Sequence, residues 1–438
     1  MPIVITVTGI LLLVLLIAYF RLHAFLAFLI VSIGIGLVLG LKPEPLMQSL
    51  QTGMGSTLGS IAGIIALGAM LGKLVGISGA AQQIAAKMTV WFGIKHLRWA
   101  FMVTGFVIGL PLFYSVGFML LVPIAITAAF RNKLPAVYVG LPLLASLSVT
   151  QGFLPPHPAP LFLVKQLNAD MGLTLMYGII ISVPAILISG ALYGSTVKKY
   201  TASPNLSFVA PAMEADQLPP VFMSLLTVLL PIVLIGGSAI LAPFLPANSF
   251  IKNTVLFMGD ATVALLITVL FALYSLDILK NHSRQEIHQQ LVTAVKEVAS
   301  LLLIFGGAGA LKQVLTDGGV SQMIAAQLHT AHMNPYVLGW TIAAIIRVCV
   351  GSSTVSGITT AGFIAPVMLA SNAINPNLMV LSIGAGSMMF SHVNDTGFWL
   401  FREYFQLSLK DTIKTWSVMD TLVSVTGLLG VLALSWIV

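Results

Sequence analysis

The stretch FSHVNDTGFWLF, Phe390 to Phe401, gathers Ser, His, Asn and Asp in the middle of an otherwise strongly apolar region. Such polar groups are costly in hydrocarbon unless a partner or a ligand satisfies them. Of the 438 residues, 58% are hydrophobic and 8% are charged, whereas about 25% of the residues of a soluble domain are charged. The sequence therefore predicts an all-α polytopic membrane protein in which the polar groups of this stretch serve a function.

The charged and sulfur-containing residues exclude several other classes of protein. The net charge of +7 does not indicate a nucleic-acid partner, because the basic residues stand between apolar runs, where they set topology. The single cysteine, Cys349, excludes a disulfide framework. The first apolar run, Ile3–Phe20, has no basic segment before it, so it is expected to be a span and not a cleaved signal peptide.

Ten apolar runs approach or exceed the roughly 20 residues that a membrane span needs. They are Ile3–Phe20, Ala24–Leu41, Gly53–Ile77, Leu134–Val164, Leu173–Val197, Val221–Leu245, Thr254–Leu276, Ala299–Leu315, Leu378–Phe401 and Thr415–Val438. Two further runs, Trp99–Ala129 and Tyr336–Ala370, are interrupted in the middle by small or polar residues, so that each half is short for a crossing. We interpret both as re-entrant helical hairpins, with a pair of kinked spans as the alternative in each case.

The basic residues predict the orientation of these spans. With ten spans and two hairpins, most Lys and Arg residues fall on one side, which the positive-inside rule makes cytoplasmic. Both termini are then expected on the opposite, periplasmic or extracellular side. The polar, Pro-rich segment 198–220 is expected to be a cytoplasmic linker between two halves, residues 1–197 and residues 221–438.

The two halves share a sequence block. GAMLGKLVGISGAAQQIAA from Gly68 resembles GAGALKQVLTDGGVSQMIAA from Gly307, and in both halves the block precedes a predicted hairpin and an interrupted span. Lys73 and Lys312 are equivalent in it, and their side chains either face the site or snorkel and cap helix ends. Each half has five predicted spans, an odd number, so the second repeat is expected to be inverted. Inverted repeats with broken helices are typical of secondary transporters, whose sites lie near the middle of the membrane.

Four polar interruptions are the candidate site. They are the hairpin tips Phe113–Gly117 and Gly351–Gly357 and the span breaks Thr150–Pro158 and Ser391–Gly397. An interrupted helix leaves backbone N–H groups free, and its N-terminal end suits an anion. The alternative is that these are kinks whose polar groups satisfy one another. The residues predicted to bind substrate are Tyr114, Ser115, Thr150, Gln151, His157, Ser352, Ser353, Thr354, His392 and Asn394.

Charged and titratable residues near these breaks have further candidate roles. Arg347, four residues before the second tip, is a candidate partner for a substrate carboxylate; the alternative is an interhelical clamp to a backbone carbonyl. His157, His392 and Asp395 are candidates for proton coupling, since imidazole titrates near neutral pH. The alternative for each His is a structural hydrogen bond.

An enzyme, a metal centre and a channel fit the sequence less well than a transporter. His157, His392 and Asp395 match metal ligands by type, but no paired His spacing is present. The chain also lacks a Walker loop and a Gly-x-Ser-x-Gly elbow. We therefore expect no enzyme activity, no metal and no cofactor.

These motifs resemble the gluconate permease family of bacterial gluconate:proton symporters, over nearly the whole chain. The strings that carry the resemblance are GSTLG from Gly55, GAMLGK from Gly68, SVTQGFLPPHP at Ser148–Pro158, GSSTV from Gly351 and SHVNDTGFWLFREYF from Ser391. The resemblance implies uptake of gluconate or a related sugar acid across the bacterial inner membrane by proton symport. The wider superfamily implies two five-span repeats, hairpins, elevator motion and a homodimer.

Two positions depart from the family pattern. The family usually has Glu where Ser115 stands and often His where Gln151 stands. Both departures remove a titratable group, so proton coupling would rest on His157, His392 and Asp395. A sodium-coupled or uncoupled carrier of another hydroxy or amino acid anion, such as D-serine, is the alternative that this leaves open.

Overall fold

The computed structural model describes residues 2–200, 217–247, 249–319, 334–369 and 374–438, and among these residues none forms a strand. The first half contains α1 (Pro2–Val14), α2 (Ala24–Val38), α3 (Pro43–Ile77), α4 (Ala80–Phe92), α5 (Leu97–Gly109), α6 (Tyr114–Arg131), α7 (Ala136–Phe153), α8 (Pro158–Gln166), α9 (Met171–Ile186) and α10 (Tyr193–Thr196). The second half contains α11 (Val221–Leu241), α12 (Phe250–Gly259), α13 (Ala261–Ser275), α14 (Ile278–Asn281), α15 (Arg284–Asp317), α17 (Pro335–Val350), α18 (Ser353–Leu369), α19 (Pro376–Gly386), α20 (Thr396–Phe405), α21 (Leu409–Thr412) and α22 (Val418–Leu434). The fold is therefore all-helical, as predicted.

All ten predicted spans and both predicted hairpins fall on helices. Within the described residues, seven helices are long and apolar enough to cross a membrane, and α12 with α13, bent by 70°, makes an eighth candidate. One of the seven is α6, an arm of the first predicted hairpin. The count of ten spans and the re-entrant course of the hairpins stay predictions.

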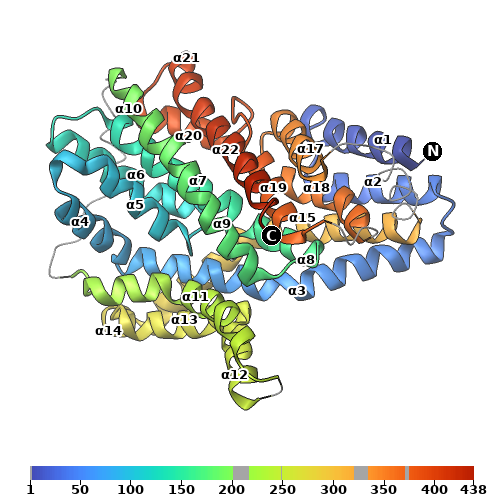
Figure 1. The fold of residues 1–438 in the computed structure, drawn as a ribbon, viewed down its shortest axis with the longest axis horizontal. Coiled ribbons are helices and arrows are strands. Elements are labelled where there is room, and N and C mark those ends of the chain that lie inside the picture. Colours follow the sequence, from blue (N-terminus) through green and yellow to red (C-terminus); the bar gives the residue numbers. More distant parts are fainter. Residues whose placement is uncertain (1, 201–216, 248, 320–333, 370–373) are drawn as a thin grey trace.

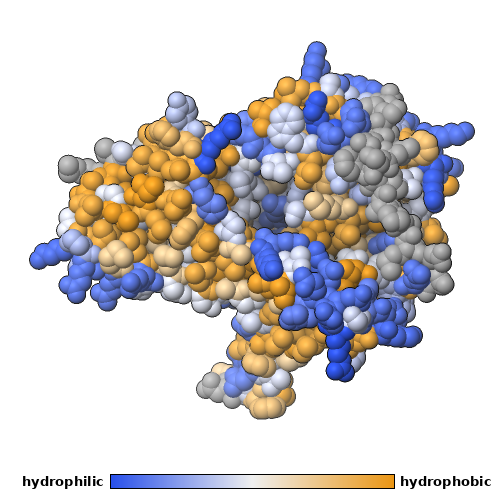
Figure 2. Space-filling model, turned by 180° about the vertical axis from the view of Figure 1, so that it is seen from behind, coloured by the Kyte–Doolittle hydropathy of each residue, from blue (hydrophilic) through white to orange (hydrophobic). Residues whose placement is uncertain are grey.

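The outer surface suits a lipid environment. Figure 2 shows wide hydrophobic areas bordered by hydrophilic residues. Large apolar side chains such as Phe222, Leu266 and Leu429 are exposed. Soluble monomers rarely expose contiguous apolar patches of more than a few hundred Å², so these areas are expected to face acyl chains.

The helices pack in two groups. One group is built on α3 and α15, which lie side by side along much of their length and pack against α2 and α13 (Figure 1). They approach most closely where Gly53 meets Gly309, because a Cβ atom on either glycine would collide with the backbone oxygen of the other. The second group contains α5, α6, α7, α9, α17, α19 and α22. Helices α8 and α18 connect the groups, α8 packing on α3 and α18 on α15.

Both predicted span breaks are present. Helix α7 ends at Phe153, and α8 begins at Pro158 after a short connection that contains Pro155 and Pro156, which have no backbone N–H to continue a helix. Helix α19 ends at Gly386, and α20 begins at Thr396. The two broken spans cross where Gly384 meets the backbone oxygen of Gly152, so the breaks of the two halves lie next to each other.

The first break is shorter than predicted. Thr150 and Gln151 still belong to α7, and the Thr150 hydroxyl donates to the carbonyl oxygen of Leu147 at 2.9 Å. Of the linker, residues 201–216 lie outside the described residues, as does the end of the second sequence block.

The two lysines of the repeated block have structural partners. Lys73 forms an exposed ion pair with Glu297 at 3.1 Å. Lys312 donates to the carbonyl oxygen of Gln166 in the last turn of α8 at 3.0 Å. The alternative in which Lys312 caps a helix end is therefore confirmed.

Candidate functional site

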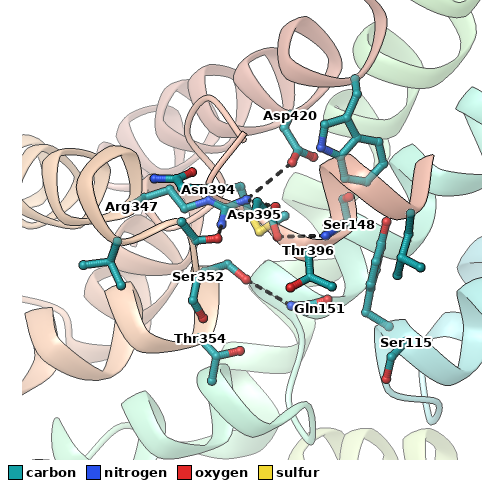
Figure 3. Close-up of a pocket in the computed structure, with 18 residues that line it drawn as sticks. Ser115, Ser148, Gln151, Arg347, Ser352, Thr354, Asn394, Asp395, Thr396 and Asp420 are labelled. Atoms are coloured by element: carbon teal, nitrogen blue, oxygen red, sulfur yellow. Dashed lines mark hydrogen bonds and ion pairs between the residues drawn. The ribbon is translucent and has the colours of Figure 1, made fainter. Parts of the chain in front are cut away.

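All four predicted interruptions contribute residues to the wall of one cavity of about 290 Å³ (Figure 3). The start of α6, the last turn of α7, the tip between α17 and α18 and the start of α20 contribute to its wall, together with residues at the start of α22. The lining side chains include Tyr114, Ser115, Ser148, Gln151, Arg347, Ser352, Ser353, Thr354, Asn394, Asp395, Thr396, Trp416 and Asp420. The sequence therefore predicted a polar convergence that the structure contains.

Arg347 is the charged centre of this cavity. Its side chain is 3% exposed, and Nη2 lies 2.6 Å from Oδ2 of Asp395. Nη1 donates to the carbonyl oxygen of Gly351, the residue that ends α17. This carbonyl stands at the end of the helix that carries Arg347, so the contact is local and is not the interhelical clamp of the alternative prediction. The carboxylate that Arg347 meets in this structure belongs to the protein itself.

Asp395 is held by three donors. Besides Arg347, the Ser391 hydroxyl donates to Oδ2, and the backbone N–H of Gly397 donates to Oδ1 at 3.0 Å. The last contact makes Asp395 the N-cap of α20. Ser391 in turn accepts a hydrogen bond from Trp416 Nε1 at 2.7 Å. The polar stretch is therefore fixed in place by hydrogen bonds within it and by donors from Arg347 and Trp416.

His392 and Asn394 are engaged at the end of α17. A ring nitrogen of His392 lies 2.9 Å from the carbonyl oxygen of Val348, and Nδ2 of Asn394 donates to the same oxygen at 2.8 Å. The last carbonyls of a helix have no partner within the helix. Both side chains therefore supply donors for the C-terminal end of α17, and only Asn394 also lines the cavity.

The second hairpin tip presents hydroxyl groups to the cavity. Ser352, Ser353 and Thr354 stand at the start of α18, a helix end whose positive potential suits an anion, and Oγ of Ser352 accepts from the N–H of Val355 at 3.3 Å. Gln151 of α7 donates to Oγ of Ser353 at 3.0 Å, which joins the two halves across the cavity. At the opposite wall, the buried hydroxyls of Tyr114 and Ser148 have no hydrogen-bond partner among the described residues.

Besides His392, two predicted residues do not line the cavity. Thr150 is buried and bonded within α7. His157 is 2% exposed, and Nε2 lies 2.6 Å from the carbonyl oxygen of Gly109, at the end of α5. His157 therefore ties the first span break to the first predicted hairpin.

The predicted site residues did not include four polar side chains of the lining, Ser148, Thr396, Trp416 and Asp420. Asp420 lies near the start of the last predicted span, Thr415–Val438; its side chain is 1% exposed, and its Oδ2 lies 3.9 Å from Nη2 of Arg347. The available signal was an acidic residue inside an apolar run, which is by default a candidate for function.

The comparison with known families decides the class of the protein. The family model described as GntP family permease matches residues 1–437. The chain belongs to the GntP permease family. The resemblance based on the motifs is therefore confirmed, and this GntP permease is a multi-pass membrane transporter and not an enzyme.

Several curated proteins resemble this GntP permease over their full length. A high-affinity gluconate transporter of Escherichia coli (strain K12) is 42% identical and is matched over 100% of both chains. The Gnt-II system L-idonate transporter of the same strain is 38% identical over 99% of each chain. A gluconate permease of Bacillus subtilis (strain 168) is 39% identical over 100% of each.

Solved structures share the fold of this GntP permease. The YdaH transporter of Alcanivorax borkumensis superposes with a TM-score of 0.68 at 16% identity, covering 94% of this chain and 97% of that one. MtrF of Neisseria gonorrhoeae gives a TM-score of 0.57 at 12% identity, covering 86% and 82%. At these identities the likeness extends to the fold alone.

Proposed function

We propose that the chain is a secondary active transporter that imports gluconate or a closely related sugar acid across the bacterial inner membrane by proton symport. The observation that carries this proposal is the chemistry of the cavity. Seven of its lining side chains bear a hydroxyl group, and they surround the guanidinium of Arg347: Tyr114, Ser115, Ser148, Ser352, Ser353, Thr354 and Thr396. The names of the relatives, gluconate and L-idonate transporters, support the same class of substrate.

The substrate is bound by its two kinds of polar group. The start of α18 and the guanidinium of Arg347 supply positive potential for the carboxylate. The surrounding hydroxyls, with Gln151 and Asn394, hydrogen-bond the substrate hydroxyls. A site built to pair with a hydroxyl strongly rejects an analogue that lacks it, because the site's own polar groups would be left unpaired.

The transport cycle is an elevator motion in a protein built from two inverted repeats. The order of elements supports the repeats: a long helix (α3 or α15), a predicted hairpin (α5–α6 or α17–α18) and a broken span (α7–α8 or α19–α20) occur in both halves. We further propose that both termini are periplasmic, that the linker is cytoplasmic and that the carrier is a homodimer.

Coupling runs through the charged groups of the cavity. Arg347 and Asp395 form the ion pair that the substrate carboxylate meets. His157 and His392 are engaged with backbone carbonyls outside the cavity lining, and their part in coupling stays a prediction. Because Ser115 and Gln151 are not titratable, a sodium-coupled or uncoupled carrier of another hydroxy or amino acid anion, such as D-serine, is the second candidate.

Uptake by proteoliposomes tests the function. Labelled gluconate should accumulate when an inward proton gradient is imposed, and a protonophore should abolish the accumulation. A sodium gradient imposed alone should have no effect. Unlabelled gluconate should compete far better than hexanoate, which has the same number of carbon atoms and no hydroxyls. Equal competition by the two, or accumulation driven by sodium alone, would count against the proposal and favour the second candidate.

A further inference from the structure

Two carboxylates face one guanidinium in the cavity. Oδ2 of Asp395 lies 2.6 Å from Nη2 of Arg347, and Oδ2 of Asp420 lies 3.9 Å from the same nitrogen (Figure 3). The three side chains come from the start of α20, from α17 and from α22. Arg347 is 3% exposed and Asp420 is 1% exposed, so bulk water does not screen their charges.

The two carboxylates differ in their hydrogen bonds. Asp395 accepts from Arg347, Ser391 and the backbone of Gly397, which together satisfy it as an anion. Neither oxygen of Asp420 has a hydrogen-bond partner among the described residues. An ionised carboxylate without donors is costly to bury. Protonation of Asp420 therefore removes a larger desolvation cost than protonation of Asp395 would.

The surroundings of Asp420 contain few other charges. The titratable or charged side chains that face it from the packed elements are Arg347, Asp395 and Tyr114 of α6. Ser148 and Trp416 complete the wall beside it with neutral groups. With both carboxylates ionised the cluster carries a net charge of −1, from one positive and two negative groups, which opposes the binding of an anion.

We infer that Asp420 takes up a proton when the substrate anion binds, while Asp395 stays ionised as the fixed partner of Arg347. This inference rests on the proposed function. A proton from water on the outer side binds a carboxylate oxygen of Asp420 and converts it to a neutral carboxylic acid. The cluster then has no net charge, and Arg347 can attract the substrate carboxylate. On the inner side the substrate leaves and the same proton returns to water, which gives one proton for each anion.

Proton uptake on binding tests this directly. Purified full-length protein in weakly buffered detergent solution is mixed with gluconate, and the protons taken up for each gluconate bound are counted with a pH indicator. By linkage, the wild type should take up about one proton for each gluconate bound. Its affinity for gluconate should fall by up to about tenfold for each unit by which the pH rises, in the range where Asp420 titrates. Asp420→Asn should take up about none, and its affinity should not follow pH there.

Three further variants separate a coupling role from a structural one. Asp420→Glu keeps a titratable carboxyl group and should take up a proton like the wild type. Asp317 on α15 accepts hydrogen bonds from Ser49 and Gln313 and does not line the cavity. Asp317→Asn should therefore leave proton uptake at the wild-type value. Asp395→Asn leaves a cluster that has no net charge while Asp420 is ionised, so gluconate should bind to it with less proton uptake than to the wild type.

The outcomes are distinguishable. Proton uptake that persists in Asp420→Asn would overturn the inference and leave the proposed function standing. Wild-type binding without proton uptake would overturn both the inference and proton symport but not the carrier. Absence of gluconate binding to the wild type would overturn the proposed function and, with it, the inference. If Asp420→Asn does not fold, infrared difference spectra of the wild type and Asp420→Glu replace it: a protonated carboxyl band should appear on binding and shift between the two, and an unshifted or absent band would contradict the assignment.

Discussion

Gly351 shows how one residue positions the charged centre of the cavity. It ends α17 in the left-handed conformation, with φ of 81°, and its carbonyl oxygen accepts from Arg347. A Cβ atom there would collide with the backbone oxygen of Asn394 and lie 2.6 Å from the carbonyl carbon of that residue. The second tip therefore packs on the broken span through a contact that only glycine permits.

We predict that Gly351→Ala weakens gluconate binding by at least about tenfold, equivalent to roughly 1.4 kcal/mol. The left-handed conformation alone costs a residue with a Cβ about 1–2 kcal/mol, and relief of the collision moves Arg347 or Asn394. Binding is measured by calorimetry on purified protein.

Gly357→Ala is the matched control for this variant. Gly357 lies on α18, six residues further along the same predicted hairpin, and a Cβ atom there would meet its nearest neighbours at 3.9 Å, an ordinary contact. Binding should be retained in this control. Wild-type affinity in Gly351→Ala would show that the tip tolerates the change.

Most of the polar residues that line the cavity could be predicted from the sequence, but not which of them bond to one another and which face the cavity. Ser352, Ser353 and Asn394 could be predicted because polar groups in apolar runs are costly unless a partner or a ligand satisfies them. The capping of α17 by His392 could not be foreseen, since it depends on which helix end lies opposite. Asp420 was missed because it lies close to the start of the last predicted span, Thr415–Val438, where a carboxylate can reach water. Its burial beside Arg347 depends on how α22 packs against α17, which the lengths of apolar runs do not record.

At the scale of elements, the crossing of α3 and α15 depends on two glycines. A Cβ atom on Gly53 would collide with the carbonyl oxygen of Gly309 and lie 2.8 Å from Cβ of Gln313. Small residues at such crossings let helix backbones approach closely, which is a main source of helix association in membranes. Substitution there should separate the two longest described helices.

We predict that Gly53→Ala destabilises the protein by about 1–3 kcal/mol, the usual cost of overpacking a close contact. The effect is measured as a lower midpoint of thermal unfolding in detergent. Gly55→Ala, two residues along the same helix, is the control, because no heavy atom of the described residues lies within 4 Å of its Cβ position. An unchanged midpoint in Gly53→Ala would mean that the two helices accommodate the methyl group without loss of stability, which contradicts the prediction.

The elements themselves were largely predictable from local chemistry. Pro155 and Pro156 fixed the first span break because neither has a backbone N–H to donate. The extent of α7 up to Phe153 and the 70° bend between α12 and α13 were not predicted. Both depend on packing between elements that are distant in sequence, which apolar run lengths do not record.

At the scale of the whole molecule, one boundary between the two groups of helices lies where α8 and α18 contact α3 and α15. Nε2 of Gln166, at the end of α8, donates to the hydroxyl of Thr57 on α3 at 2.9 Å, and both side chains are buried. If the cavity-bearing helices slide as a body in an elevator motion, this contact must break once in every cycle. Contacts within that body, such as Ala159 of α8 against Gly357 of α18, must instead persist.

We therefore predict that a cross-link between positions 57 and 166 stops transport. Thr57→Cys and Gln166→Cys are combined in a Cys349→Ser background, which removes the native cysteine, and joined by a short bifunctional methanethiosulfonate. Gluconate uptake by proteoliposomes should fall to background and return after reduction. The control pair, Ala159→Cys with Gly357→Cys, lies within the proposed moving body and should transport equally well before and after the same treatment. Unimpaired uptake by fully cross-linked Thr57→Cys/Gln166→Cys would show that α8 and α3 stay together throughout the cycle, which contradicts sliding at this interface.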